Sequence, residues 1–226
     1  MLMTSLDQEP KHTLAKFAHY DRDLLDRMFG DAKPEKYPAG RLLFLQDDPS
    51  DRVYGLLAGS VEISIFSAEG DKLVANLQFP PSLIGEIGVL DGGRRTATAI
   101  CRSECSIVSL TRKQVLDRIE RDPLLGRAII ELLCKRLRWI SEELGDHTFL
   151  AIEARLAKRL LHLSELLSDA AGWIAISQSE LAQTLGATRE SVNKLLNDWR
   201  GRGLIATKRG HVKVNDPARL RRVSSE

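Results

Sequence analysis

The sequence predicts an α+β protein: an N-terminal antiparallel β-roll (jelly roll) with flanking helices, a long central helix, and a C-terminal winged helix-turn-helix. Short β-rich runs separated by turn residues fill the chain from Glu35 to Leu110. After Leu110 the apolar residues recur at helical spacing. The last third holds two helical segments around a glycine turn, followed by a hairpin pattern. We therefore expect three units, residues 1–122, 123–147 and 148–226.

The predicted roll consists of six β-rich runs, which are "RLLFL", "DRVYGLLAG", "SVEISIFS", "DKLVANLQF", "TATAI" and "CSIVSL". Turn signals such as "YPAG", "DDPS" and "AEGD" separate them. Evenly spaced short strands favour an antiparallel roll over a parallel sheet with helical crossovers. Before the roll, the first 30 or so residues are typical of short helical pieces, with apolar positions at Leu14, Phe17, Leu24, Leu25 and Met28.

A short helix and a long helix are expected after the roll. Thr111 is a suitable N-cap for "TRKQVLDRIE", and Pro123 suits the first turn of a helix that runs to about His147. Spacings of three and four residues in this helix favour the seam of a two-stranded coiled coil, formed by Ile130, Leu133, Leu137, Ile140 and Leu144. The same stripe can instead pack on its own roll. We expect dimerisation because the helix is longer than one roll needs, and a hinge at residues 145–150.

The segment "QSELAQTLGATRESVNKLLNDWRGRGLI", residues 178–205, carries the pattern of a helix-turn-helix. Ala182 supplies the small residue that two closely crossing helices need, and Gly186 tolerates positive φ in the turn. Thr188 is placed to cap the second helix, and Glu190 suits its first turn because the helix dipole favours an acid there. A helical hairpin used only for packing is the alternative.

Several polar residues around the second helix suit DNA. Base edges are the expected targets of four of them, Arg189, Glu190, Asn193 and Lys194. Phosphate contacts are expected from Ser177, Thr188, Lys208 and Arg209, the last two at the tip of a β-hairpin wing. Residues 186–222 contain ten Lys or Arg and three acids, whereas the whole chain has a net charge of only +2. This local surplus indicates a polyanion-binding surface, although a solvated basic face gives the same count.

A second motif, "GEIGVLDGGRRTATAI" at residues 85–100, indicates a small anionic ligand. A single helical turn after Gly85 would present free backbone amides to an anion. Arg95 offers a planar fork of donors for a phosphodiester, Thr96 adds a hydroxyl, and Glu86 can accept a hydrogen bond from a sugar hydroxyl. A ribose joined to one phosphate would satisfy all three. The alternative is an ion pair between Glu86 and Arg95 in a ligand-free roll.

With both motifs in place, the chain resembles the Crp-Fnr transcription regulators from about Leu14 to Val223. In cyclic-nucleotide sensors of this kind, the resemblance implies that Gly85 and Glu86 hold the ribose and that Arg95 and Thr96 hold the cyclic phosphate. We add Ile87 to this predicted site. The same resemblance puts Ile140 and Ser141 at the positions that meet the base. We favour cAMP; cGMP stays open because Ile140 replaces a threonine of the cAMP pattern and Thr96 also occurs in cGMP-selective pockets.

The resemblance also implies partners. These are a second copy of the chain bound through the central helix, a palindromic DNA site with TGTGA-like half-sites, and RNA polymerase. The expected function is a transcription regulator under allosteric control by a cyclic nucleotide. The alternative is a family member that binds DNA without a nucleotide effector.

Other function classes lack support in the sequence. His162 and His211 are isolated from any nucleophile motif or carboxylate pair, so we expect no enzyme activity. The three cysteines lack metal-ligand spacing and none precedes Cys101, so we expect no metal, haem or iron-sulfur cluster. The N-terminal sequence lacks a signal-peptide pattern and no apolar run is long enough to span a membrane. We expect a cytoplasmic protein.

Overall fold

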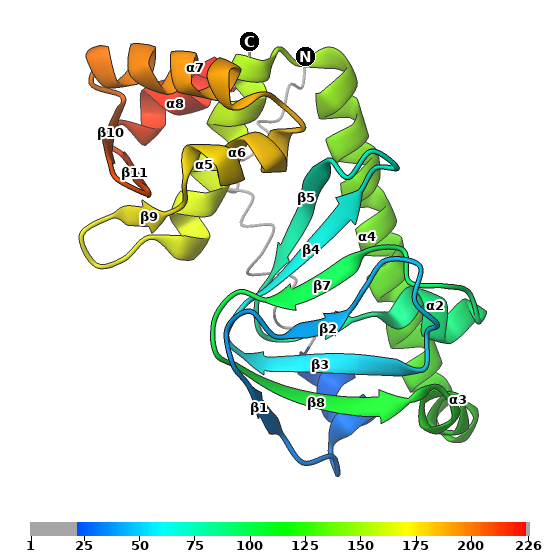
Figure 1. The fold of residues 1–226 in the computed structure, drawn as a ribbon. Coiled ribbons are helices and arrows are strands. Elements are labelled where there is room, and N and C mark those ends of the chain that lie inside the picture. The colour runs from blue at the N-terminus through cyan, green and yellow to red at the C-terminus, as the bar shows by residue number, and fades with distance from the viewer. Residues whose placement is uncertain (1–21, 225–226) are drawn as a thin grey trace, which may run out of the picture.

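The computed structural model describes residues 22–224, and their N-terminal part forms the expected antiparallel roll (Figure 1). It contains two four-stranded sheets, with strand orders β1-β8-β3-β6 and β2-β7-β4-β5. The strands are β1 (Glu35–Tyr37), β2 (Leu42–Phe44), β3 (Arg52–Ala58), β4 (Val61–Phe66), β5 (Lys72–Gln78), β6 (Ser82–Ile84), β7 (Thr98–Cys101) and β8 (Cys105–Thr111). The six predicted runs all contain strands. The three-residue strands β1 and β6 were not among them.

Two apolar clusters stabilise the roll. One lies between the sheets and includes the fully buried side chains of Leu56, Val61 and Ile107. The other joins sheet residues such as Leu83 to the helices that flank the roll, including Leu125 of the central helix. Residues 22–29 form one of these helices. The rest of the predicted N-terminal helical region, with Leu14 and Phe17, lies outside the described residues.

Three helices accompany the roll, and two of them, α3 and α4, begin at a side-chain cap. Helix α2 (Glu86–Asp91) forms the single turn expected after Gly85. Helix α3 (Arg112–Arg121) starts at Thr111, whose hydroxyl accepts from the amide of Gln114 in a capping box. Helix α4 (Pro123–Phe149) has Asp122 as its N-cap. It extends past His147, so residues 145–149 are helical rather than a hinge. The break falls at residues 150 and 151.

The C-terminal part is a winged helix-turn-helix. Its elements are α5 (Ile152–Leu167), β9 (Trp173–Ala175), α6 (Gln178–Leu185), α7 (Arg189–Gly201), β10 (Ile205–Lys208), β11 (His211–Val214) and α8 (Pro217–Val223). Gly186 between α6 and α7 has a φ of 57°, as the turn requires. Leu181 and Leu185 of α6 pack with Val192 and Trp199 of α7 in one core. The wing strands β10 and β11 pair antiparallel, and β11 also pairs with β9.

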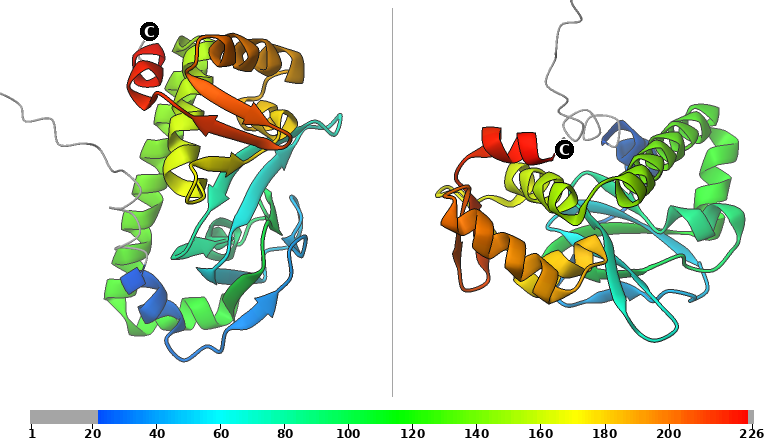
Figure 2. Two further views of the ribbon diagram at one scale, coloured as in Figure 1. Left: turned by 90° about the vertical axis from the view of Figure 1, so that its left-hand side faces the viewer. Right: turned by 90° about the horizontal axis from the view of Figure 1, so that it is seen from above.

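Helix α4 runs along the roll and reaches the C-terminal domain, which lies beside strand β5 (Figure 2). The two domains touch directly. Arg102, after strand β7, donates to the carbonyl of Ala175 at 3.1 Å and lies 3.0 Å from Oε1 of Glu180 in α6. Leu77 of β5 packs against the core of the C-terminal domain. Among residues 22–224, no helix is both long and apolar enough to cross a membrane.

Candidate functional site

The predicted ligand motif begins with a glycine that no other residue can replace without strain. Gly85 has a φ of 78°, in the left-handed region. A Cβ added to it would lie 2.5 Å from Nη1 of Arg95 and 3.0 Å from the ring of Phe44. The absence of a side chain at Gly85 therefore lets the start of α2 approach Arg95.

Arg95 is buried, with 3% of its surface exposed. Its Nη1 donates to the carbonyl of Gly85 at 2.8 Å and its Nη2 to the carbonyl of Arg52 at 2.6 Å. The guanidinium lies 4.1 Å from the centre of the Phe44 ring, within range of a cation–π interaction. Burial lowers the pKa of Arg95 below its usual value. Its Nε is buried and has no hydrogen-bond partner among the described residues.

Glu86 is also buried, but its partner differs from the one that the sequence suggested. Its Oε1 lies 2.5 Å from Nη1 of Arg136, and Nη2 of the same guanidinium donates to the carbonyl of Leu83 at 2.6 Å. The considered Glu86–Arg95 ion pair is therefore not the contact that holds this carboxylate. Arg136 belongs to α4, 50 residues away, and it was missed. The sequence signal that could have identified Arg136 is its place one helical turn after Leu132, which is buried against the roll.

A second buried polar atom lies next to α2. Oγ of Ser50 has no partner among the described residues, and a Cβ on Gly88 would overlap it. Buried polar groups are usually hydrogen-bonded, so an orphan here and at Nε of Arg95 suits an incoming acceptor such as a phosphate. Ile87 and Thr96 are exposed. The residues present therefore fit an anionic ligand beside α2.

The two predicted base contacts lie on another part of the molecule's surface. Ile140 is 53% exposed, and the hydroxyl of Ser141 donates to the carbonyl of Leu137 in its own helix. Three further apolar residues of this helix, Ile130, Leu137 and Leu144, are between 62% and 66% exposed. Leu133, the remaining member of the stripe, packs at the edge of the roll's helical core. Most of the stripe thus faces solvent in one copy of the chain.

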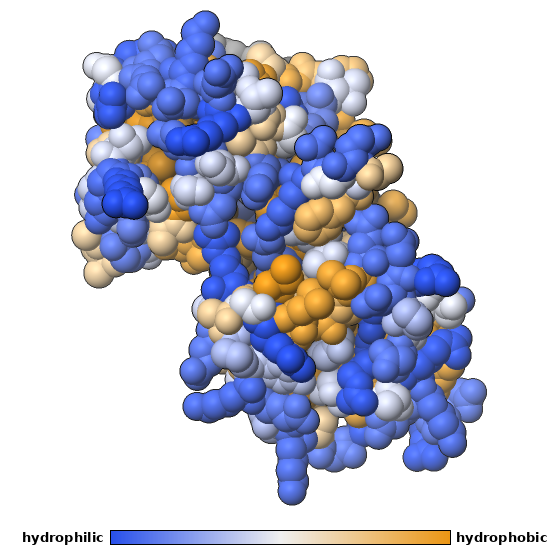
Figure 3. Space-filling model, viewed as in Figure 1, coloured by the Kyte–Doolittle hydropathy of each residue, from blue (hydrophilic) through white to orange (hydrophobic). Residues whose placement is uncertain are grey.

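The residues predicted to contact DNA lie on the C-terminal domain. Thr188 caps α7, because its Oγ1 accepts from the amide of Ser191 at 3.2 Å. On α7, Arg189, Glu190 and Lys194 are exposed, whereas Asn193 is half-buried and accepts from Nδ2 of Asn197 at 3.3 Å. Figure 3 shows a mainly hydrophilic surface over this domain.

The N-cap of α6 and the wing hold the remaining predicted phosphate contacts. Ser177 caps α6 in a capping box with Glu180. Lys208 and Arg209 are exposed at the turn between β10 and β11. The ammonium of Lys208 lies 4.3 Å from the centre of the Trp173 ring. Ser177 thus lies at a helix N-terminus, Lys208 is the last residue of strand β10, and Arg209 lies in the turn that follows.

The cysteines of the roll are buried free thiols. Burial, with neighbouring Cys105, raises the pKa of Cys101 to about 12, so its thiol stays protonated near neutral pH. Residues 22–224 contain no group of three or more His, Cys, Asp and Glu side chains arranged to hold a metal ion.

Comparison with known proteins agrees with both motifs. A cyclic nucleotide-binding domain model matches residues 34–122, and a Crp-like helix-turn-helix domain model matches residues 154–223. The CRP-like cAMP-activated global transcriptional regulator of Mycobacterium tuberculosis is 31% identical over 195 residues, which are 84% of this chain and 87% of the relative. The chain belongs to the CRP family. It is therefore a cyclic-nucleotide-binding, DNA-binding transcription regulator and not an enzyme.

Two further proteins are similar to this chain, one in sequence and one in fold. The cyclic AMP receptor protein of Thermus thermophilus is 30% identical over 188 residues, covering 83% of this chain and 86% of the relative. In fold, the chain is similar to the c-di-GMP-responsive global regulator CLP of Xanthomonas campestris, with a TM-score of 0.74, 23% identity, and coverage of 85% of this chain and 98% of that one. The two domain models match residues on either side of α4 (Pro123–Phe149).

Proposed function

We propose that this CRP-family protein is a homodimeric, sequence-specific regulator whose DNA affinity is set by a cyclic nucleotide, with cAMP favoured and cGMP the second choice. The observation that carries the proposal is the contact between Glu86 and Arg136. The carboxylate that would accept from the ribose is bonded to the central helix, so a ligand at α2 acts directly on α4.

The ligand would be held by residues of the roll. Glu86 accepts from a ribose hydroxyl, Gly85 allows close approach, and Ile87 follows on the same turn. Arg95 and Thr96 donate to the cyclic phosphate, and Nε of Arg95 and Oγ of Ser50 are the buried groups that lack partners. When bound, the nucleotide would supply one negative charge and one hydroxyl donor to these groups.

The base would be met at Ile140 and Ser141, which lie on the exposed side of α4. Ile140 belongs to the apolar stripe that a second copy would cover. We therefore place the base contacts next to the dimer seam, where Ser141 can exchange its bond to Leu137 for one to the base. This arrangement couples ligand binding to the packing of two central helices.

The output is proposed at the C-terminal domain. Helix α4 passes into residues 150 and 151 and then α5, so a change in α4 alters the position of α7. In a dimer, two α7 helices about 34 Å apart would enter successive major grooves of a palindromic site with TGTGA-like half-sites. Arg189, Glu190, Asn193 and Lys194 would read bases, and Ser177, Thr188, Lys208 and Arg209 would hold phosphates. RNA polymerase is the expected protein partner, in the cytoplasm.

Calorimetry with purified protein tests the ligand. We expect cAMP or cGMP to bind and Arg95→Ala to abolish the binding, while Arg94→Ala, an exposed neighbour bonded to the carbonyl of Asp47, retains it. Cyclic di-GMP belongs in the panel because a relative in fold responds to it. Absence of binding of cAMP and cGMP at millimolar concentration would exclude the proposed ligands.

A second candidate is a roll that needs no ligand. It is favoured by one observation: the Nη atoms of Arg95 already donate to backbone carbonyls. Gel mobility shift with and without nucleotide separates the two candidates. Equal DNA affinity in both conditions supports the ligand-independent regulator.

A further inference from the structure

An aromatic pair is buried in the roll next to Arg95. Phe44 ends strand β2 and Tyr54 belongs to β3, so the pair joins the two sheets. The ring centres are 5.9 Å apart and the ring planes differ by 28°, which is a stacked arrangement. Both residues are 9% exposed. The hydroxyl of Tyr54 donates to the carbonyl of Leu43 at 3.3 Å, so the chain just before Phe44 is also held in place.

The guanidinium of Arg95 packs on this pair. Its central carbon lies 4.1 Å from the centre of the Phe44 ring, and water is excluded because Arg95 is only 3% exposed. The negative face of an aromatic ring attracts a cation, and the attraction is stronger where both are desolvated. A Cβ on Gly85 would come within 3.0 Å of the Phe44 ring as well as close to Arg95. These three residues therefore form one close-packed cluster.

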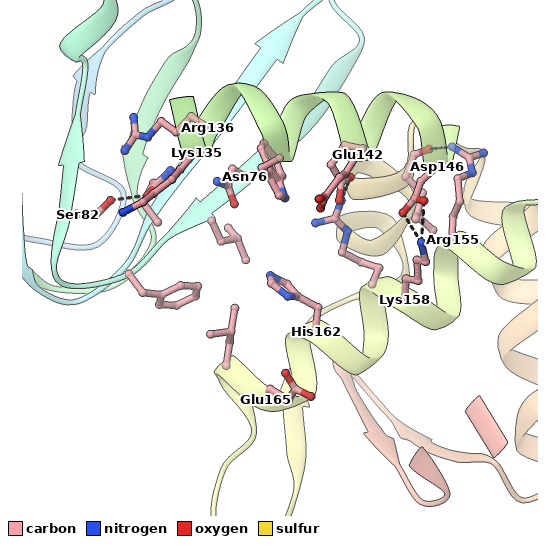
Figure 4. Close-up of a pocket in the computed structure, with 18 of the residues that line it drawn as sticks. Asn76, Ser82, Lys135, Arg136, Glu142, Asp146, Arg155, Lys158, His162 and Glu165 are labelled. Atoms are coloured by element: carbon pink, nitrogen blue, oxygen red, sulfur yellow. Dashed lines mark hydrogen bonds and ion pairs between the residues drawn. The ribbon is translucent and has the colours of Figure 1, made fainter. Parts of the chain in front are cut away.

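Two carboxylates near Arg95 are poor partners for its charge. Glu86 is bonded to Arg136, which extends from α4 and lines, together with His162 of α5, a separate cavity of about 610 Å³ between the domains (Figure 4). Oδ1 of Asp51 lies 3.6 Å from Nη2 of Arg95, but the Asp51 side chain is 78% exposed, so water screens its charge. Burial lowers the pKa of Arg95, since the loss of hydration is only partly offset by these acids.

Three contacts therefore fix the plane of the guanidinium. Nη1 donates to the carbonyl of Gly85 and Nη2 to that of Arg52, while the Phe44 ring covers one face. The two carbonyls resist movement within the plane. The ring resists tilting out of it, because a tilted guanidinium would lose contact with the aromatic face. Nε of Arg95 is left without a partner among residues 22–224.

We propose that Phe44 is a positioning residue of the phosphate site, because its ring face holds the Arg95 guanidinium in the plane that keeps Nε available to an incoming phosphate. This role rests on the proposed function, in which a cyclic nucleotide binds beside α2. It goes beyond filling space in the roll. Leucine is also apolar but has no aromatic face, so it cannot hold the guanidinium in the same way.

Fluorination of the Phe44 ring tests this role with little change of shape, because fluorine atoms weaken the negative face of the ring. Mono-, di- and trifluorophenylalanine are introduced at position 44 of the full-length protein, and calorimetry gives the affinities for cAMP and cGMP. We expect a stepwise loss that reaches at least threefold with trifluorophenylalanine, and a loss of at least tenfold in Phe44→Leu. The same series at Phe29, which is buried in the other apolar cluster of the roll, should leave the affinity unchanged.

The 2′-deoxy forms of both nucleotides separate the phosphate site from the ribose contact. They lack the free ribose hydroxyl, so their affinity relative to the parent nucleotide reports the contact with Glu86. This ratio should be the same in the wild type and in every Phe44 variant. A changed ratio would indicate a general distortion of the site and would contradict a role confined to Arg95.

Circular dichroism and the thermal midpoint establish that each variant is folded. A wild type that binds nucleotide, with equal affinity across the fluorinated series at position 44, would overturn the role of Phe44 alone. So would an equal loss in the Phe29 series. A wild type that binds neither cAMP nor cGMP at millimolar concentration would overturn the proposed ligand, and this role with it.

Discussion

The carboxylate of Glu86 and the guanidinium of Arg136 are 2.5 Å apart, and this contact joins helix α2 of the roll to the central helix. Glu86 is almost fully buried, and the Arg136 side chain is 26% exposed. An ionised carboxylate is costly to bury without a partner, so the two residues depend on each other. The contact also means that the predicted ribose acceptor is already engaged by α4.

A double-mutant cycle with Glu86→Gln and Arg136→Gln measures this dependence. We expect each single variant to unfold more easily than the wild type and the double variant to recover part of the loss, with a coupling energy of about 1–3 kcal/mol. Urea unfolding gives the four free energies. Purely additive effects would contradict a direct contact in solution.

Arg95→Lys tests the geometry of the phosphate site. Lysine retains the charge but lacks the planar fork and Nε, so cyclic nucleotide affinity should fall at least tenfold. Titration calorimetry provides the affinity, with Arg94→Lys as the control. An unchanged affinity would mean that charge alone, rather than the orphan Nε, recruits the ligand.

Leu137→Asp tests the exposed stripe of α4. Leu137 is 65% exposed in one copy. An aspartate at this position would face the aspartate of the second copy across the helix seam, and the two negative charges would repel each other. We expect the wild type to sediment as a dimer and the variant as a monomer. Lys113→Asp introduces the same charge on the exposed side of α3 and should remain dimeric. A variant that stays dimeric would move the interface away from this stripe.

Arg189→Ala and Arg209→Ala separate base reading from phosphate binding. Loss of a base contact should weaken binding to the preferred site by about 1–3 kcal/mol and relax the preference at one base pair. Loss of a phosphate contact should weaken all sequences similarly and reduce the salt dependence. Fluorescence anisotropy at several salt concentrations with matched and altered half-sites distinguishes them. Similar behaviour of both variants would contradict the assigned roles.

His162 makes stability depend on pH. Its folded pKa of about 4 lies below the ordinary value of 6.5, so the unfolded chain binds a proton first as the pH falls. The contribution is fully present above about pH 6.5 and is lost progressively toward pH 4, to a limit of about 3 kcal/mol. Urea unfolding across this range should show a smaller loss for His162→Leu than for the wild type. Parallel curves would mean that the imidazole is solvated.

The sequence predicted the elements that local chemistry determines. Caps and turns depend on a few adjacent residues. The sequence could therefore predict the helix caps at Thr111 and Thr188 and the turn at Gly186. Strands β1 and β6 were missed because both adjoin prolines, Pro34 and Pro38 for β1 and Pro80 and Pro81 for β6, and proline indicates a turn. The end of α4 was placed too early because Gly145, a poor helix former, is tolerated there without a break.

The site was only partly predictable for a related reason. Gly85, Glu86 and Arg95 lie within eleven residues of the sequence, so their closeness in space could be expected from the sequence alone. The contact of Glu86 with Arg136 depends on how α4 packs against the roll, and no pattern of neighbouring residues predicts that packing. The cavity at His162 likewise requires β5, α4 and α5 to be in place, so its histidine seemed isolated in the sequence.

Helix α4 is uninterrupted from Pro123 to Phe149, so a tilt at one end displaces the other end. At a rise of about 1.5 Å per residue, the stretch from Arg136 to Phe149 is about 20 Å long. A tilt of about 10° around the Arg136 end would therefore displace the Phe149 end by about 3 Å. A sub-ångström adjustment at one guanidinium can in this way become a movement as large as the spacing between a side chain and a base edge.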